Sequence, residues 1–179
     1  MIFPLFRRKP RGADTISTLY GMIVAQARLP TFYRDYAVAD TVNGRFDLVL
    51  LHLWMVLRRL RSAASGTALS QALFDHFCTD MDDNLREMGI GDQTVPKRMR
   101  EFGEAFYGRT AAYDMALTEG REALAGAICK NVLNGERIEK ARELAAYAEA
   151  AMARLAEFDD AALLGGRWQF PAPRQARPQ

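Results

Sequence analysis

The chain has 179 residues, a length that suits one domain with a single hydrophobic core. Its 49% of hydrophobic and 26% of charged residues are typical of a globular protein. Six basic residues lie near the two ends, and without them the chain keeps 18 basic and 22 acidic residues. This balance excludes a body that attracts polyanions overall, so we expect no DNA partner and assign any attraction to phosphates to the termini.

The two ends differ in composition from the middle of the chain. The opening MIFPLFRRKPRG places its basic residues after its apolar ones, which is not the order of a signal peptide, and its prolines break any helix. We expect residues 1–13 to form a flexible basic arm, residues 14–173 a helical domain and residues 174–179 a disordered tail. Residues 1–11 could touch an anionic membrane surface, and no stretch is long enough to span a bilayer.

The first predicted helix precedes an aromatic turn. Asp14 or Thr15 can cap this helix, and Pro30 ends it. Three aromatic residues follow in a short turn or a one-turn helix and are expected to pack under a loop: Phe32, Tyr33 and Tyr36. Asn43 and Gly44 then form a helix breaker directly before the next helix.

The stretch Arg45–Arg61 has two apolar faces when it is placed on a helix at about 100° per residue. The broader face carries Phe46, Val49, Leu50, Leu53, Val56, Leu57 and Leu60. The opposite face carries Leu48, Leu51, Met55 and, near its boundary, Trp54. A surface helix has one apolar stripe, so a helix with two needs partners on both sides. We therefore predict that this is the central helix of the domain.

Four further helices are predicted downstream, at about Thr67–Met88, Pro96–Leu117, Glu122–Leu133 and Ile138–Phe158. The first of them places Phe77, Met81 and Met88 on its core face. Trp168 and Phe170 alternate in the tail and indicate an extended strap that docks on the helices. No alternating β-branched segment appears. The expected fold is all-α: a single-domain bundle of about six to seven helices, with a central two-sided apolar helix and an extended C-terminal strap.

Residues that commonly carry catalysis are scarce. No GxSxG, HExxH or GxxxxGK[ST] motif is present, so we expect no enzymatic activity and no cofactor. His52 is expected to be a core histidine with a hydrogen-bonded partner. His76 and Asp80, one helical turn apart, suit either two metal ligands or a solvated acidic stripe. Cys78 and Cys129 are expected to be reduced, buried thiols in a cytoplasmic protein.

Two charged clusters remain as candidate binding surfaces. An acidic cluster shares one face of a predicted helix: Asp80, Asp83 and Glu87. A basic cluster begins the following helix: Lys97, Arg98 and Arg100. The helix dipole disfavours positive charge at that end, so stability does not explain the basic cluster. A contact role is weighed against a solvated face balanced by Glu101 and Glu104.

Four long segments, in order, resemble a known family: Tyr20–Thr41, Gly44–Leu60, Gln71–Asp92 and Val95–Asp114. The most specific patterns within them are DMDxxLREMGxGD and AFYGRxxAYD. Over about residues 16–133 the chain resembles the ubiquinol–cytochrome c chaperone family. The last predicted helix and the strap lie outside these segments and are argued from composition alone.

The resemblance implies an assembly chaperone for the ubiquinol–cytochrome c reductase complex (the bc1 complex, respiratory complex III). Its expected client is newly made cytochrome b, with the ribosome or a second assembly factor as further partners. The family supplies no agreed catalytic residues, so none is assigned. The absence of a transit-peptide pattern leads us to expect the bacterial form, a monomer on the cytoplasmic side of the inner membrane and peripheral to it.

A chaperone for a client with many membrane helices needs an adaptable apolar groove with charged borders. The candidate groove uses Leu48, Leu51, Trp54 and Met55, bordered by Arg58, Tyr107 and Arg109. In the alternative interpretation, the four apolar residues pack against a second layer of helices. The acidic cluster offers a second contact, with basic loops of the client.

Two alternative functions stay open at this point. The first is a ribosome- or RNA-associated module that couples translation to membrane insertion through the basic cluster and the basic termini. The second is an uncharacterised helical enzyme or a haem-handling protein.

Overall fold

The computed structural model describes residues 11–174, with side chains from Thr15 onward. This part of the chain forms α-helices and no strand, which confirms the all-α, single-domain bundle. Its helices are α1 (Arg11–Ala27), α2 (Pro30–Arg34), α3 (Val42–Arg61), α4 (Gly66–Glu87), α5 (Val95–Glu119), α6 (Arg121–Val132), α7 (Ile138–Ala156) and α8 (Asp160–Leu164). The expected basic arm and disordered tail lie mostly outside the described residues, and α1 begins at Arg11, ahead of the expected cap.

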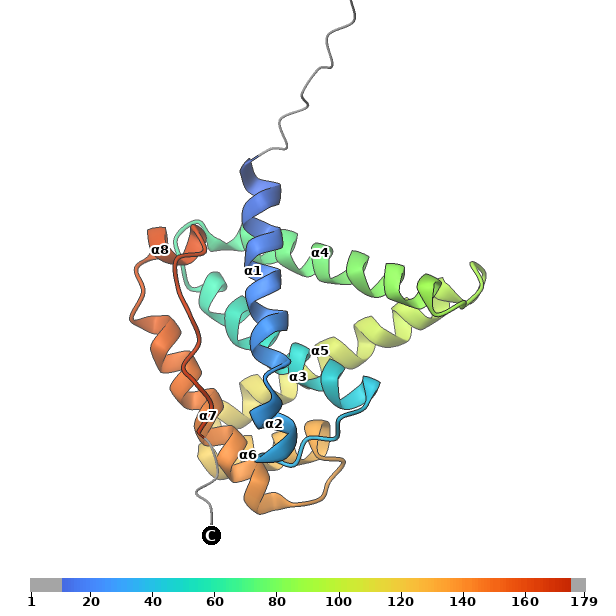
Figure 1. Cartoon of the computed structure of the whole chain (residues 1–179). Coiled ribbons are helices and arrows are strands. Elements are labelled where there is room, and N and C mark those ends of the chain that lie inside the picture. The colour runs from blue at the N-terminus through green and yellow to red at the C-terminus, as the bar shows by residue number, and fades with distance from the viewer. Residues whose placement is uncertain (1–10, 175–179) are drawn as a thin grey trace, which may run out of the picture.

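The helices are arranged around α3. Helices α1, α4, α6 and α7 all contact it. In Figure 1, α4 and α5 extend together to one side of the molecule, whereas α7 and the C-terminal segment lie on the other side. No helix in residues 11–174 is long and apolar enough to cross a membrane.

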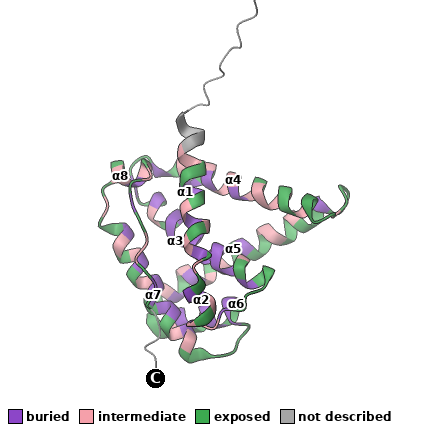
Figure 2. Cartoon of the chain, in the orientation of Figure 1, coloured by how far each residue is buried: buried purple, intermediate pink, exposed green. Residues whose placement is uncertain are grey.

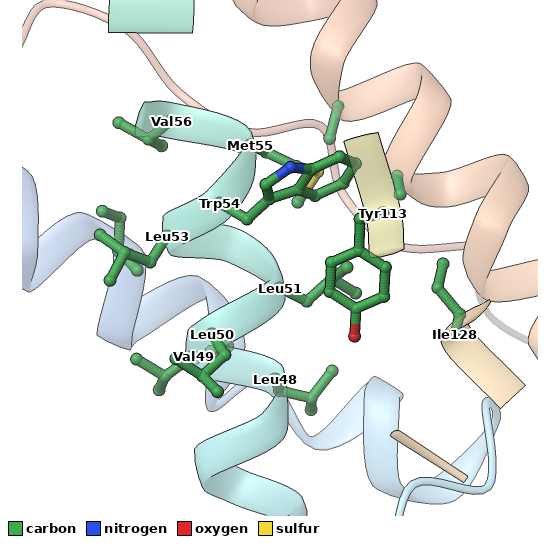
Figure 3. Packing of buried hydrophobic residues seen from close by; sticks show 14 of the residues in the cluster. Leu48, Val49, Leu50, Leu51, Leu53, Trp54, Met55, Val56, Tyr113 and Ile128 are labelled. Atoms are coloured by element: carbon green, nitrogen blue, oxygen red, sulfur yellow. The ribbon is translucent and has the colours of Figure 1, made fainter. Parts of the chain in front are cut away.

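Helix α3 is buried on both faces, as its two apolar stripes predict. Every residue from Asp47 to Leu57 is buried, and Figure 2 shows the visible middle part of this helix largely as buried. In Figure 3, Leu51 and Trp54 lie on the side of Tyr113, and Leu53 lies on the opposite side. Each large apolar side chain removed from water contributes about 1.5–3 kcal/mol, so both faces stabilise the bundle.

The start of α3 corrects one sequence interpretation. Asn43 and Gly44 do not break the chain before the helix, because they lie in its first turn. The Thr41 side chain caps this turn, with its Oγ1 accepting from the Gly44 amide at 3.2 Å. A Cβ on Gly44 would lie 2.0 Å from the carbonyl oxygen of Ala39. The glycine is therefore required by close backbone approach rather than by a turn.

The predicted C-terminal strap is present as residues 167–174, which have no regular structure and run back along α7 (Figure 1). Trp168 is buried, and the Gln26 side-chain amide donates to the carbonyl oxygen of Pro171 at 3.0 Å. The amide of Arg174 donates to the Tyr36 hydroxyl at 3.0 Å. These bonds tie the end of the described chain to α1 and to the segment after α2.

His52 is a hydrogen-bonded core histidine, as expected. Its Nδ1 lies 2.7 Å from the Leu48 carbonyl oxygen, and a carbonyl can only accept, so Nδ1 donates. Its Nε2 therefore accepts from the Tyr147 hydroxyl at 2.9 Å. The Tyr147 oxygen in turn accepts from the Gln26 amide at 2.9 Å. The chain of donors and acceptors is complete when the imidazole is neutral.

Candidate protein-binding surface

The candidate groove on α3 is not a surface feature. Leu48, Leu51 and Met55 are completely buried, and Trp54 is 1% exposed. The Trp54 ring packs on Tyr113 with 5.0 Å between centroids. The prediction that these residues line an exposed groove is therefore wrong. The alternative interpretation is the one that the structure supports: the four residues pack against a second layer of helices. Helices α5, α6 and α7 bury this face of α3 (Figure 3).

Two charged residues that were predicted to border that groove form ion pairs with other residues of the same chain. Arg58 pairs with Asp114 on α5 at 2.7 Å, and Asp114 also accepts from the Trp54 indole at 3.0 Å. Arg109 pairs with Asp47 at 2.5 Å. Burial raises the pKa of Asp47 to about 6, although the charge of Arg109 opposes this shift. Both pairs join α3 to α5, so these residues hold the bundle together.

The distal part of α4 and the first half of α5 form a projection that we call the α4–α5 arm, residues 80–107. Figure 1 shows the two helices converging at a tip away from the other helices. Between Cys78 and Ala105 a single residue, Val95, is buried, and Figure 2 shows the arm largely as exposed or intermediate. Gly89 turns the chain at the tip with φ of 80°. The arm therefore has much surface and little core.

Aromatic rings fix the base of the arm. Phe77 of α4 packs on Phe102 of α5 at 5.1 Å between centroids, and Phe102 packs on Phe46 of α3 at 5.0 Å. Phe74 packs on Phe106 at 4.7 Å. Stacked and edge-on aromatic pairs add about 0.5–1.5 kcal/mol each beyond their buried area. The direction of the arm is thus set by rings from three helices.

The acidic cluster on α4 is divided by the structure. Asp80 accepts a hydrogen bond from the Tyr20 hydroxyl at 2.6 Å, and this contact ties α1 to α4. Burial and the neighbouring Asp80 carboxylate raise the pKa of Tyr20. Asp83 and Glu87 are exposed and make no ion pair with a described residue. Two of the three acidic residues thus remain available at the surface.

The basic cluster at the start of α5 is also divided. Arg98 pairs with Glu101 at 3.1 Å. Lys97 and Arg100 are exposed and form no ion pair within residues 11–174. Helical spacing places Glu104 on the same face as both of them. The surface here is of mixed charge rather than continuously basic.

Helix α5 presents one exposed face along much of its length. At about 100° per residue the following side chains share an arc of this helix. They are all exposed and define what we call the α5 outer face: Lys97, Arg100, Glu104, Tyr107, Gly108, Ala111 and Met115. Tyr107 is 62% exposed and Met115 is 66% exposed. The face is therefore charged near the tip of the arm and apolar towards the bundle.

The sequence interpretation found Tyr107 but missed two exposed methionines. Met115 was not singled out, although its spacing sets it opposite Phe106 and Tyr113, which are buried. Met88 was expected on the core face of α4. Instead α4 ends at Glu87, and Met88 at the tip is 65% exposed. The helical period would have revealed Met115, whereas Met88 depends on where α4 ends.

A helical body that projects an arm with exposed aromatic, methionine and charged side chains has the kind of surface that protein-binding domains use. The chain belongs to the ubiquinol-cytochrome C chaperone family, whose model matches residues 34–170. The match includes α7 and part of the strap, which lie outside the four segments that resemble the family in the sequence. This family is one of chaperones rather than a known enzyme family.

Individual relatives agree with this assignment. A crystal structure of a Cbp3 homolog from Brucella abortus matches with a TM-score of 0.83 and 39% identity, over 96% of this chain and 97% of that chain. Ubiquinol-cytochrome-c reductase complex assembly factor 1 of Xenopus laevis is 27% identical over 117 residues, which is 65% of this chain and 58% of the relative. The mitochondrial protein CBP3 of Saccharomyces cerevisiae is 23% identical over 149 residues, 79% of this chain and 44% of the relative.

The chain spans only part of the curated relatives just named, 58% of one and 44% of the other. The residues matched by the family model, 34–170, include the whole arm.

Proposed function

We propose that this protein is an assembly chaperone for the ubiquinol–cytochrome c reductase complex and that it holds newly made cytochrome b on the α5 outer face and the tip of the arm. Family membership supports the assembly role, since several relatives are named as assembly factors of that complex. The observation that carries the choice of surface is the exposure of Tyr107 and Met115, at 62% and 66%.

The chemistry of this surface suits an unassembled membrane protein. Methionine is flexible and polarizable, so Met88 and Met115 can adapt to varied apolar segments. Tyr107 offers a large apolar ring with a polar end, a residue type enriched at interfaces. Asp83 and Glu87 stand near the tip, where they would attract the basic cytoplasmic loops of the client. Apolar and charged contacts thus lie along the arm and the adjoining part of α5.

The proposal keeps the expected setting, a monomer on the cytoplasmic side of the inner membrane and peripheral to it. The residues of the former groove take a different role in it. Leu48, Leu51, Trp54 and Met55 support α5 from beneath and do not touch the client.

The test changes the α5 outer face while leaving the fold intact. A Tyr107→Asp/Met115→Asp variant should lower the assembled bc1 complex and the cytochrome b haem absorbance in cells. Ile138→Asp is the matched control, because Ile138 is also an exposed apolar residue, at 40%, but lies on α7. Thermal unfolding should show that all variants fold. Normal assembly in the double variant would exclude this face as the client surface.

A crosslinking experiment separates the client from the general assembly role. A photo-reactive residue at position 107 or 88 should form a crosslink to cytochrome b, and one at position 138 should not. Crosslinks to another assembly factor alone would leave the chaperone role standing and overturn the assignment of cytochrome b to this surface.

A further inference from the structure

A pocket separate from the arm lies where the end of α1, helix α2 and the start of α3 meet. Its volume is about 380 Å³, within the range of about 300–1,000 Å³ that small-molecule sites occupy. Its lining consists of Arg28, Pro30, Tyr33, Arg34, Asp40 and Arg45. Three of these six side chains are guanidinium groups, so the pocket is suited to an anion.

The local fold explains how three arginines meet. Arg28 directly follows α1, and Arg34 is the last residue of α2, a helix of five residues that starts at Pro30. Arg45 lies near the start of α3. The Tyr33 hydroxyl donates to the Ala27 carbonyl oxygen at 2.9 Å, which fixes its ring between these elements. The pocket is therefore built by a short, well-tied turn.

The positive charge in the pocket is only partly neutralised. Arg45 Nε pairs with Asp40 at 2.7 Å, and this contact lowers the pKa of Asp40. Arg28 and Arg34 make no ion pair with a residue that the structure describes. The charges of Arg45 and Arg28 both lower the pKa of Tyr33 against the effect of its burial, so both act on the same phenol.

Placing several positive charges close together is unfavourable unless an anion lies between them. The partial positive charge at the start of α3 adds to that of Arg45 instead of offsetting it. Guanidinium groups present forked donors that match the oxygens of phosphate in number and spacing. The surplus of two arginines thus favours a dianionic or phosphodiester group over a single neutral ligand.

We propose that this pocket binds a phosphate group, carried either by a soluble phosphate compound or by a lipid headgroup. The site is independent of the α4–α5 arm and of the client proposal. It differs from the expectation that attraction to phosphates comes only from the termini.

The first test is a titration of the full chain with inorganic phosphate at constant ionic strength, followed by backbone amide shifts. Saturable shifts are expected at residues 28–45. An Arg28→Gln/Arg34→Gln variant should weaken binding by about tenfold for each arginine removed, since hydrogen bonds to charged groups are the strong ones. The matched control is Lys130→Gln/Arg137→Gln, which removes two charges from other exposed positions and should bind as the parent does.

A second variant is expected to gain affinity for phosphate, a result that misfolding of the protein could not produce. Asp40→Asn removes the carboxylate that competes for Arg45, so phosphate should bind more tightly to it than to the parent chain. Unchanged or weaker binding by Asp40→Asn, or shifts that persist in the Arg28→Gln/Arg34→Gln variant, would overturn the proposal.

Vesicles distinguish the two sources of phosphate. Co-sedimentation compares phosphatidylcholine vesicles with vesicles that also contain phosphatidylglycerol. Binding to the anionic vesicles that is lost in the Arg28→Gln/Arg34→Gln variant, and kept in the control, identifies a lipid headgroup. Phosphate binding in solution without such a vesicle difference identifies a soluble phosphate compound. Neither saturable phosphate binding nor a vesicle difference between the variants would exclude the site.

Discussion

His52 is a neutral structural residue. Burial lowers its pKa to about 4, from an ordinary value of 6.5. Phe32 and Phe170 pack on its ring at 5.3 and 5.2 Å between centroids, so water could not solvate a positive charge on the imidazole. Protonation would also place a second donor beside a tyrosine hydroxyl that now donates to it. The histidine thus stabilises the fold only while it is uncharged.

This predicts a pH dependence of the unfolding free energy. The unfolded chain binds a proton near pH 6.5, and the native chain does not until about pH 4. Stability is therefore lost as the pH falls through that window, by at most about 1.4 kcal/mol per pH unit for one proton. Urea unfolding should show a steeper loss in the parent chain than in His52→Gln. Parallel pH profiles for the two proteins would contradict the prediction.

The Tyr147 hydroxyl is the centre of the same network. Tyr147→Phe leaves His52 Nε2 without a donor and the Gln26 amide with one acceptor fewer. We expect a loss of about 1–3 kcal/mol in unfolding free energy, the usual cost of an unsatisfied buried group. Tyr107→Phe is the control, because this hydroxyl is on an exposed side chain. Equal stability of the two variants would show that the network contributes nothing.

At the scale of the helix, the start of α3 depends on Gly44. Gly44→Ala should destabilise the protein by about 1–3 kcal/mol, because the added Cβ meets backbone that cannot rotate away. Gly21→Ala in α1 is the matched control. No atom lies within 4 Å of a Cβ at Gly21, so alanine should stabilise this helix by about 0.5–1 kcal/mol. Chemical denaturation of both variants tests whether the signs differ.

The element that the sequence predicts best is α3, since its two apolar stripes require cover on both sides. The sequence cannot say what supplies that cover, and the second stripe was equally suited to a client. The deciding contacts join residues far apart in the chain. The bond from Trp54 to Asp114, for instance, spans 60 positions. Periodicity identifies a face of a helix, but it does not identify the neighbour that meets it.

The same reason limits prediction of the site. In the sequence, Arg58 and Arg109 look like surface charges. In the structure, Arg58 of α3 pairs with a carboxylate of α5, and Arg109 of α5 pairs with a carboxylate of α3. The three arginines of the proposed phosphate pocket are spread over residues 28–45 and line one pocket only when α1, α2 and α3 are packed together. Tyr107 was predicted as a border of the candidate groove, and its exposure follows from the helical period of α5 once the buried face of that helix is known.

At the scale of the molecule, stability is unevenly distributed. Helix α3 is buried at every residue from Asp47 to Leu57, whereas the arm has Val95 as its one buried residue between Cys78 and Ala105. We expect amides near the tip to exchange with solvent through local opening, and those of α3 only through global unfolding. Hydrogen exchange monitored by mass spectrometry tests this expectation. Protection of the tip equal to that of α3 would refute it.

The strap has a consequence for the order in which the protein can mature during synthesis. Gln26, His52, Tyr147 and Pro171 meet in one network, although they leave the ribosome at widely separated times. Until α7 has emerged, one side of α3 has only α5 and α6 as cover from its own chain. Until the strap follows, the ring of His52 lacks its contact with Phe170. A chain arrested before Tyr147 would therefore expose part of the hydrophobic core that the folded protein buries.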